Sequence, residues 1–126
     1  MLQIDIMSRT PVYEQISAQI EKLISSGILK EGEQLPSVRS LSIELSVNPN
    51  TIQKAYGELD VRGIIGSVPG KGCFVMPGAQ EKLRMIAKGR LIELKSLAQT
   101  LMAAGVTKEE IINTVNSITS EKEETK

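Results

Sequence analysis

Apolar side chains recur every three or four residues in five segments of the chain, and this spacing predicts five helices. The segments are residues 11–27, 37–45, 48–62 and 80–104, and a last one that begins at residue 107. Glycine suits a helix end because it adopts the left-handed backbone conformation easily. Gly27, Gly63 and Gly105 stand where three of these segments should stop.

Residues 64–76 follow a different pattern, in which two short strand-like runs flank the turn sequence PGKG. This pattern predicts a small β-hairpin, which is too short to be stable without the helices. The second and third helices are joined by the tight turn LSVNPN, which is typical of a helix-turn-helix. The predicted fold class is therefore mostly α with a small β-hairpin: a winged helix-turn-helix domain at residues 1–77.

The segment from Asn48 to Arg62 has two distinct sides. Asn48 can cap the helix and Pro49 fits its first turn, while the apolar residues fall on one side. The other side carries Asn50, Gln53 and Lys54, whose amide and ammonium groups can pair with base edges or phosphates. A solvated surface is the alternative explanation for an isolated helix of this kind.

The remaining residues, 78–126, are predicted to form two helices with a broad apolar surface. The apolar residues of the first of these helices form a stripe that resembles the seam of a coiled coil. Together with the last helix, this stripe is predicted to form a dimer interface, whose residues are Leu83, Ala87, Leu91, Leu94, Ala98, Leu101, Ile111 and Val115. Folding back onto the first domain is the alternative use of this surface. Residues 120–126, SEKEETK, are expected to be a solvated tail.

The composition narrows the function classes. The chain contains no histidine, which removes the most common general base and metal ligand, and its single cysteine excludes an internal disulfide. No apolar run is long enough to span a membrane and no secretory signal is visible, so a cytoplasmic protein is expected. No cofactor loop or metal cluster is recognised, and the chain is not expected to be an enzyme.

The charge balance bears on nucleic-acid binding. The whole chain has 15 basic and 15 acidic residues, and residues 1–78 hold seven basic and eight acidic ones. DNA-binding domains usually have a basic excess. A DNA-binding function would therefore depend on where the charges are placed, and its affinity should fall steeply with salt. The near-neutral charge favours the alternative, a winged helix that contacts another protein and has no DNA role.

Residues 11–75 resemble the GntR family of bacterial transcription regulators. The motifs that carry the resemblance are Pro-x-Tyr at the start, Leu-Pro-Ser-x-Arg at residues 35–39, the Ala-Tyr-x-x-Leu end of the third helix, and the hairpin sequence GKGCFV. The short helical tail is similar to the YtrA-type subgroup. The resemblance implies a homodimer that binds a palindromic operator, usually as a repressor and often at transporter genes.

The resemblance also implies which residues contact double-stranded DNA. They are Ser37, Arg39, Asn48, Asn50, Thr51, Gln53, Lys54, Lys71 and Gly72. Lys71 and Gly72 would form the tip of the wing, and Arg39 would contact DNA unless it pairs with a carboxylate such as Glu44. The sequence leaves open whether a small-molecule effector binds, and whether Cys73 is more than a small strand residue.

Overall fold

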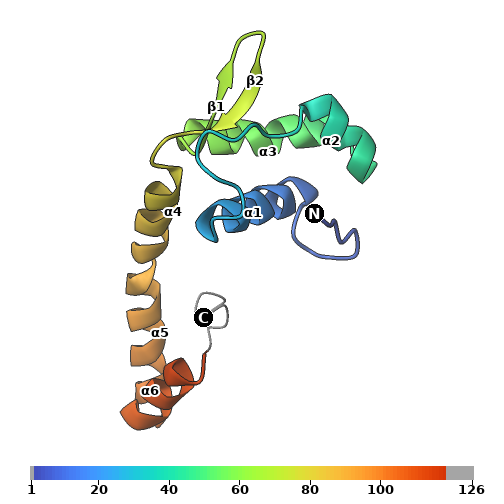
Figure 1. Cartoon of the computed structure of the whole chain (residues 1–126). Helices are drawn as coiled ribbons and strands as arrows, with labels where there is room; N and C mark the ends of the chain where they lie inside the picture. The colour runs from blue at the N-terminus through green and yellow to red at the C-terminus, as the bar shows by residue number, and fades with distance from the viewer. Residues whose placement is uncertain (1, 119–126) are drawn as a thin grey trace. The chain divides into compact units, whose positions relative to one another are not determined.

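The computed structural model describes residues 2–118, in which six helices and one antiparallel hairpin follow one another (Figure 1). Contacts divide the chain into two compact units, one ending at Arg84 and the other beginning at Met85. The elements are α1 Val12–Ser25, α2 Val38–Leu45, α3 Pro49–Val61, β1 Ile65–Val68, β2 Gly72–Val75, α4 Ala79–Lys88, α5 Leu91–Ala103 and α6 Lys108–Asn116. The predicted fold class, mostly α with a small β-hairpin, is confirmed.

The segment before α1 is held against that helix by two glutamines. Gln19 accepts a hydrogen bond from Gln3 N at 2.9 Å and donates one back to Gln3 O. Gln15 does the same for Asp5, with distances of 2.9 Å from Asp5 N and 3.0 Å to Asp5 O. Each carboxamide pairs with both the backbone N–H and the backbone C=O of one residue, as a neighbouring β-strand would. These backbone groups therefore need no partner in a sheet.

The core of the first unit forms where α1 packs against α3. Ile16, Ile20 and Ile24 of α1 are at most 2% exposed, and Ile52 and Leu59 of α3 are fully buried. Full burial of one such side chain stabilises a fold by about 1.5–3 kcal/mol relative to exposure. The core is completed by Leu35, Leu41, Ala55, Tyr56, Ile64, Ile65, Val75, Ala79 and Leu83.

The helix-turn-helix is fixed by two side-chain caps. Ser37 Oγ accepts from Ser40 N at 3.0 Å and begins α2. Asn48 Oδ1 accepts from Asn50 N at 2.8 Å and begins α3, which has a proline in its first turn. Between the helices Ser46 has a φ of 55°, a left-handed conformation that ends α2 sharply. These features confirm the predicted turn and position the polar side of α3.

The hairpin has a third backbone partner that the sequence did not reveal. β1 and β2 pair antiparallel, with Ile65 opposite Val75 and Val68 opposite Gly72. The segment before α2 adds to the free edge of β2: Leu35 N donates to Cys73 O at 2.8 Å. Gln34 Nε2 donates to Lys71 O at 2.8 Å, close to the hairpin tip. The wing is thereby connected to the start of α2.

The first unit extends beyond residue 77 because α4 begins within its core. Ala79 is fully buried and Leu83 is 7% exposed, both in the core cluster of this unit. Gln80 Nε2 also donates to Ser25 O at 3.0 Å. Leu83 is therefore a core residue here and is not available for the predicted dimer interface. The compact unit ends seven residues later than the predicted boundary, at Arg84.

The prediction of one continuous helix over residues 80–104 is wrong. α4 ends at Lys88 and α5 begins at Leu91. Arg90 N donates to Ala87 O, only three residues back, at 3.0 Å. Gly89 stands at the break, and glycine in a helix interior costs about 1 kcal/mol relative to alanine. The chain therefore interrupts the helix where its backbone is least constrained.

The last described helix is α6. Thr107 Oγ1 accepts from Glu110 N at 3.1 Å and Glu110 Oε2 accepts from Thr107 N at 2.8 Å, which confirms the predicted capping box. No residue of α5 or α6 is buried. The predicted solvated tail, residues 120–126, lies outside the described residues.

Candidate nucleic-acid interface

α3 separates its apolar and polar residues as predicted. Ala55, Tyr56 and Leu59 are buried, as is Ile52, whereas Asn50, Gln53 and Lys54 are exposed and Thr51 is half-buried. Lys54, the one charged side chain of these three, forms no ion pair within residues 2–118. The helix therefore presents amide and ammonium groups to solvent on the side opposite its buried residues.

A groove of about 560 Å³ lies between α3 and the hairpin. It brings together four of the predicted DNA contacts, since Ser37, Gln53, Lys71 and Gly72 all line it. The other lining residues are Val38, Tyr56, Gly57, Asp60, Val61, Ser67, Val68, Gly70 and Cys73. Asn48, Asn50, Thr51 and Lys54, together with Arg39, do not line this groove. The candidate interface is therefore wider than the groove itself.

Gly57 and Asp60 line the groove but were not among the predicted contacts. A Cβ atom built on Gly57 would meet nothing within 4 Å, so the fold itself does not require a glycine there. Asp60 adds a negative charge to a surface proposed to face phosphates. Helical spacing in the sequence already places these two residues one turn apart on α3. It does not show that the hairpin packs beside them, which is why they were missed.

Both capping residues are engaged in the fold but keep hydrogen-bond donors. Ser37 uses its oxygen as an acceptor for α2, which leaves its O–H able to donate. Asn48 uses Oδ1 for α3, which leaves its amide NH₂. Helix N-termini also direct unpaired backbone N–H groups outward, which favours anions. Each helix start can therefore hold a phosphate without a charged side chain.

Arg39 and Lys71 have no carboxylate partner in the described part of the chain, whereas Arg62 at the end of α3 pairs with Glu21. Arg39 is exposed and does not form the ion pair with Glu44 that was its alternative explanation. Lys71 is exposed in the hairpin turn, where Lys71 N donates to Val68 O at 2.9 Å. Lys82 differs, because its ammonium donates to Gly63 O at 3.2 Å.

Lys54 has a partner that the sequence did not reveal. Its Nζ lies 4.0 Å from the centre of the Tyr13 ring, in a cation–π contact between α3 and α1. In the sequence Tyr13 belongs to the Pro-x-Tyr motif and to the apolar spacing of the first helix, and neither points to Lys54. Its proximity to Lys54 depends on how α1 packs against α3, which periodicity alone does not give.

Burial raises two pKa values beside the groove. The Tyr56 hydroxyl donates to Pro36 O at 2.7 Å, and desolvation raises the pKa of Tyr56 well above its usual range. Desolvation is also the main cause that raises the pKa of the Cys73 thiol. A raised pKa lowers the thiolate fraction and hence reactivity, which favours the interpretation of Cys73 as a small strand residue.

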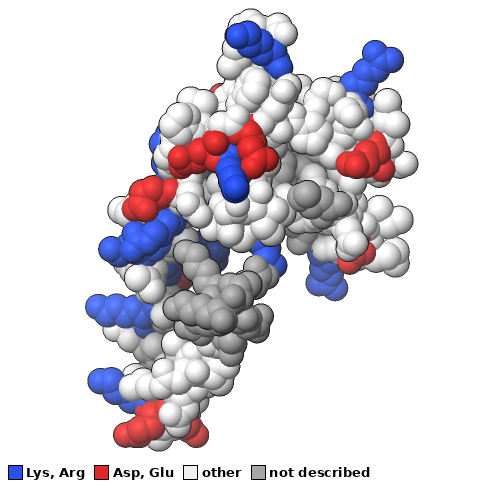
Figure 2. All heavy atoms as spheres, in the orientation of Figure 1, with Lys and Arg blue, Asp and Glu red and all other residues white. Residues whose placement is uncertain are grey.

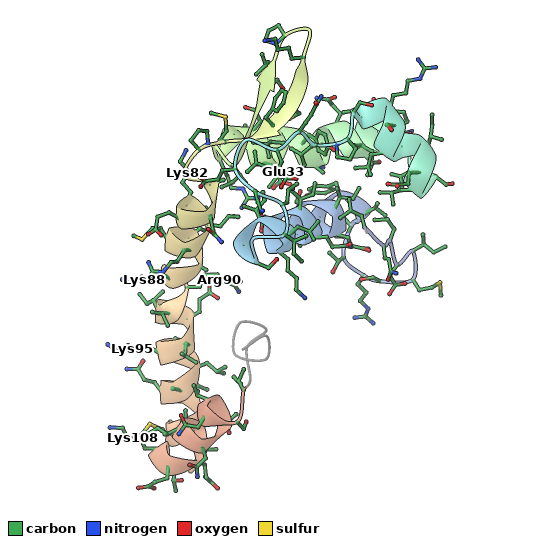
Figure 3. The ribbon with its side chains drawn as sticks, viewed as in Figure 1. Glu33, Lys82, Lys88, Arg90, Lys95 and Lys108 are labelled. Carbon is green, nitrogen blue, oxygen red and sulfur yellow. The ribbon has the colours of Figure 1, made fainter. Side chains whose placement is uncertain are left out.

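Charges are dispersed over the molecule. Figure 2 shows basic and acidic side chains interspersed on the visible face of the first unit. In the second unit Lys88, Lys95 and Lys108 project from the same side of the tail helices (Figure 3).

Among the described residues no cluster of three or more His, Cys, Asp or Glu could hold a metal ion.

Comparisons with known proteins identify the fold and the family. The model of the gntR family of bacterial regulatory proteins matches residues 12–75, just over half of the chain. The chain belongs to the GntR family. It is 38% identical to the HTH-type transcriptional repressor YtrA of Bacillus subtilis, over 96% of this chain and 94% of that protein.

Solved structures of a GntR regulator and of another DNA-binding domain share this fold. A GntR family transcriptional regulator from Listeria monocytogenes has a TM-score of 0.74 and 34% identity, and the match covers 92% of this chain and all of that one. The DNA-binding domain of AraR in complex with operator ORX1 has a TM-score of 0.53 and 32% identity, over 59% of this chain and 92% of that one.

The GntR assignment decides between the function classes. This chain is a DNA-binding transcription regulator of the winged-helix type, and the family is one of regulators, not enzymes. The alternative of a winged helix without a DNA role is thereby set aside. None of the helices found in residues 2–118 combines the length and the apolar character needed to cross a membrane.

Proposed function

We propose that this GntR protein is a homodimeric repressor that binds a palindromic operator through α3 and the hairpin of each subunit. The observation that carries the proposal is the groove between α3 and the hairpin, which gathers Ser37, Gln53, Lys71 and Gly72 from three separate elements. A polar helix beside a hairpin can engage the major groove and the neighbouring backbone together. The relationship to a YtrA repressor supports repression as the regulatory outcome.

Base recognition is assigned to the first two turns of α3. Asn50 and Gln53 are exposed, and each carboxamide can pair with the two major-groove groups of an adenine. Thr51 is half-buried between them and can contact a thymine methyl group or a phosphate. These residues should set the sequence preference, because phosphate contacts carry little sequence information.

Phosphate contacts are assigned to the groups around these side chains. Arg39 of α2 and Lys71 of the hairpin turn are exposed and have no carboxylate partner among the described residues. Ser37 and Asn48 add neutral donors at two helix starts. Because few charges take part and the first domain has no basic excess, the affinity should be modest and strongly reduced by salt.

The second unit is proposed to join two copies. Leu91, Leu94, Leu97 and Leu101 are 57%, 46%, 57% and 37% exposed, although they recur at helical spacing along α5. On α6, Val115 is 47% exposed and Ile111 is half-buried. Contiguous apolar surface of this kind marks an interaction site. A second copy of the same helices buries it symmetrically, with Ala87 and Ala98 allowing close approach.

Selection of bound duplexes from a random DNA pool tests the operator proposal. We expect an inverted repeat, with half-sites separated by about one helical turn or a multiple of it. Asn50→Ala and Gln53→Ala should then weaken binding to the selected duplex by about 1–3 kcal/mol each. Gln99→Ala is the matched control, since Gln99 is an exposed amide on α5 and is not among the residues assigned to DNA. Equal binding by all three variants and the parent would contradict the assignment of α3.

Sedimentation velocity tests the dimer. We expect the parent chain to sediment as a dimer, and Leu94→Lys and Leu101→Lys to sediment as monomers with greatly weakened operator binding. Gln99→Glu introduces a charge elsewhere on α5 and should remain dimeric. A parent chain that stays monomeric at the concentrations used for DNA binding would refute the dimer.

Two further expectations stay proposals. Transporter genes as targets rest on the family resemblance alone, and mapping of the bound chromosomal sites would test them. A small-molecule effector has no assigned site. Leu94 and Leu97 do line a hollow of about 370 Å³ with Ala87, Arg90 and Glu93, but a second subunit would cover the same residues.

A further inference from the structure

One cation of the candidate interface is held by an aromatic ring. Lys54 Nζ lies 4.0 Å from the centroid of Tyr13, well inside the range in which a cation is attracted to the ring face. Tyr13 is the second residue of α1 and is half-buried, so its ring offers Lys54 a support on the neighbouring helix. Most exposed lysines have no such support and explore many rotamers.

The Tyr13 hydroxyl has a partner of its own. Tyr13 Oη donates to Glu14 Oε1 at 3.2 Å. This hydrogen bond is the main cause that raises the pKa of Tyr13 above its usual value. Glu14 and Glu58 both act on Tyr13 electrostatically, yet Lys54 forms no ion pair within 4.0 Å of either carboxylate.

The choice of a ring over a carboxylate has an electrostatic consequence. A carboxylate in contact would hold the ammonium but pair with its charge, whereas an aromatic face holds it without a contact ion pair. The first domain has no net positive charge to spare. A lysine that is already restrained loses less conformational entropy when it meets a phosphate, and without a contact ion pair it has no carboxylate to release first.

We propose that Tyr13 is a positioning residue that holds Lys54 as a phosphate contact at the α1 edge of α3. Lys54 does not line the groove beside the hairpin, where Gln53 lies. Its role is therefore affinity for the DNA backbone on the opposite edge, independent of sequence. This inference rests on the proposed function and extends the interface to α1.

The test is a double-mutant cycle of Tyr13→Leu and Lys54→Gln, with Tyr13→Phe as the matched control that keeps the ring. Binding is measured to the duplex selected by the parent chain and to a scrambled duplex, over a series of salt concentrations. Tyr13→Leu should weaken binding to both duplexes by roughly twofold to tenfold. It should also reduce the slope of log K against log salt by up to about one.

Two comparisons within the cycle decide the outcome. Tyr13→Phe should bind within about twofold of the parent, because phenylalanine also attracts cations. In the Lys54→Gln background, Tyr13→Leu should cause no further loss. Additive effects, or equal losses for the Phe and Leu variants, would overturn the inference. If Tyr13→Leu does not fold, as judged by circular dichroism, Tyr13→Met replaces it in the cycle.

The failure of this inference is distinguishable from the failure of the proposed function. A parent chain that binds neither duplex overturns both. A parent chain that binds its selected duplex, with a cycle that shows no coupling, overturns only the role of Tyr13. The NMR shifts of the Lys54 side-chain methylene protons give an independent readout: they should lose a ring-current contribution in Tyr13→Leu and keep it in Tyr13→Phe.

Discussion

Replacing Gly57 by alanine should stabilise the first unit. Gly57 lies inside α3 and has no positive φ, so alanine can adopt its backbone conformation. The new Cβ would meet no atom within 4 Å, so no packing is lost or strained. Alanine is favoured over glycine in a helix interior by about 0.8–1.0 kcal/mol. We therefore expect the free energy of unfolding to rise by about 1 kcal/mol.

Thermal unfolding followed by circular dichroism measures this change. For a domain of about this size, 1 kcal/mol raises Tm by roughly 4–8 °C. Parent and variant must be compared at one protein concentration, because dimerisation makes Tm depend on concentration. Gly63→Ala is the control, and it should lower the free energy of unfolding instead of raising it. Gly63 has a φ of +74°, and a left-handed conformation costs a non-glycine residue about 1–2 kcal/mol.

The result that would refute this reasoning is a Gly57→Ala variant that is no more stable than the parent chain. Such a result would mean that the folded chain itself needs the glycine, through an interaction not visible in the packing around α3. A Gly63→Ala variant as stable as the parent would likewise contradict the backbone argument. Both outcomes are independent of DNA binding.

The remaining predictions concern a buried hydroxyl, a cap and a core side chain. Tyr56→Phe should cost about 1 kcal/mol at neutral pH, because Pro36 O loses its partner. Since burial raises the pKa of Tyr56 in the folded state, the parent should lose stability above about pH 10, and the Phe variant should lose less in denaturant titrations across that range. Thr107→Ala removes a capping box and should destabilise α6 by about 1 kcal/mol, which hydrogen exchange of the α6 amides would report as faster exchange. Ile52→Ala should lower the free energy of unfolding by about 2–5 kcal/mol in urea titrations, because this side chain is fully buried between α1 and α3.

The sequence predicted the features of the fold that depend on neighbouring residues. Asn48 and Ser37 begin helices because their side chains cap nearby backbone N–H groups, and the hairpin follows from a short turn. The interruption at Gly89 was missed because the leucine spacing continues across it, so periodicity outweighed a single weak helix former. The burial of Leu83 was missed for a related reason, since spacing shows that a face is apolar but not what covers it.

The candidate site was predictable in its residue types and less so in its connections. The polar side of α3 follows from helical spacing, which places Asn50, Gln53 and Lys54 opposite the core. The contact of Lys54 with Tyr13 joins residues 41 positions apart. Their proximity follows from the packing of two helices, which no local pattern encodes. The DNA-binding roles of these side chains stay predictions until binding is measured.

The attachment of the hairpin to the segment before α2 has a practical consequence for protein engineering. Gly32, Glu33 and Leu35 exchange backbone hydrogen bonds with β2, and Gln34 reaches the carbonyl of Lys71. A chimera that imports only residues 64–76 from another regulator would separate the wing from its anchor and leave those groups unmatched. A functional graft therefore has to transplant residues 32–35 along with the hairpin, because the two segments form one hydrogen-bonded unit.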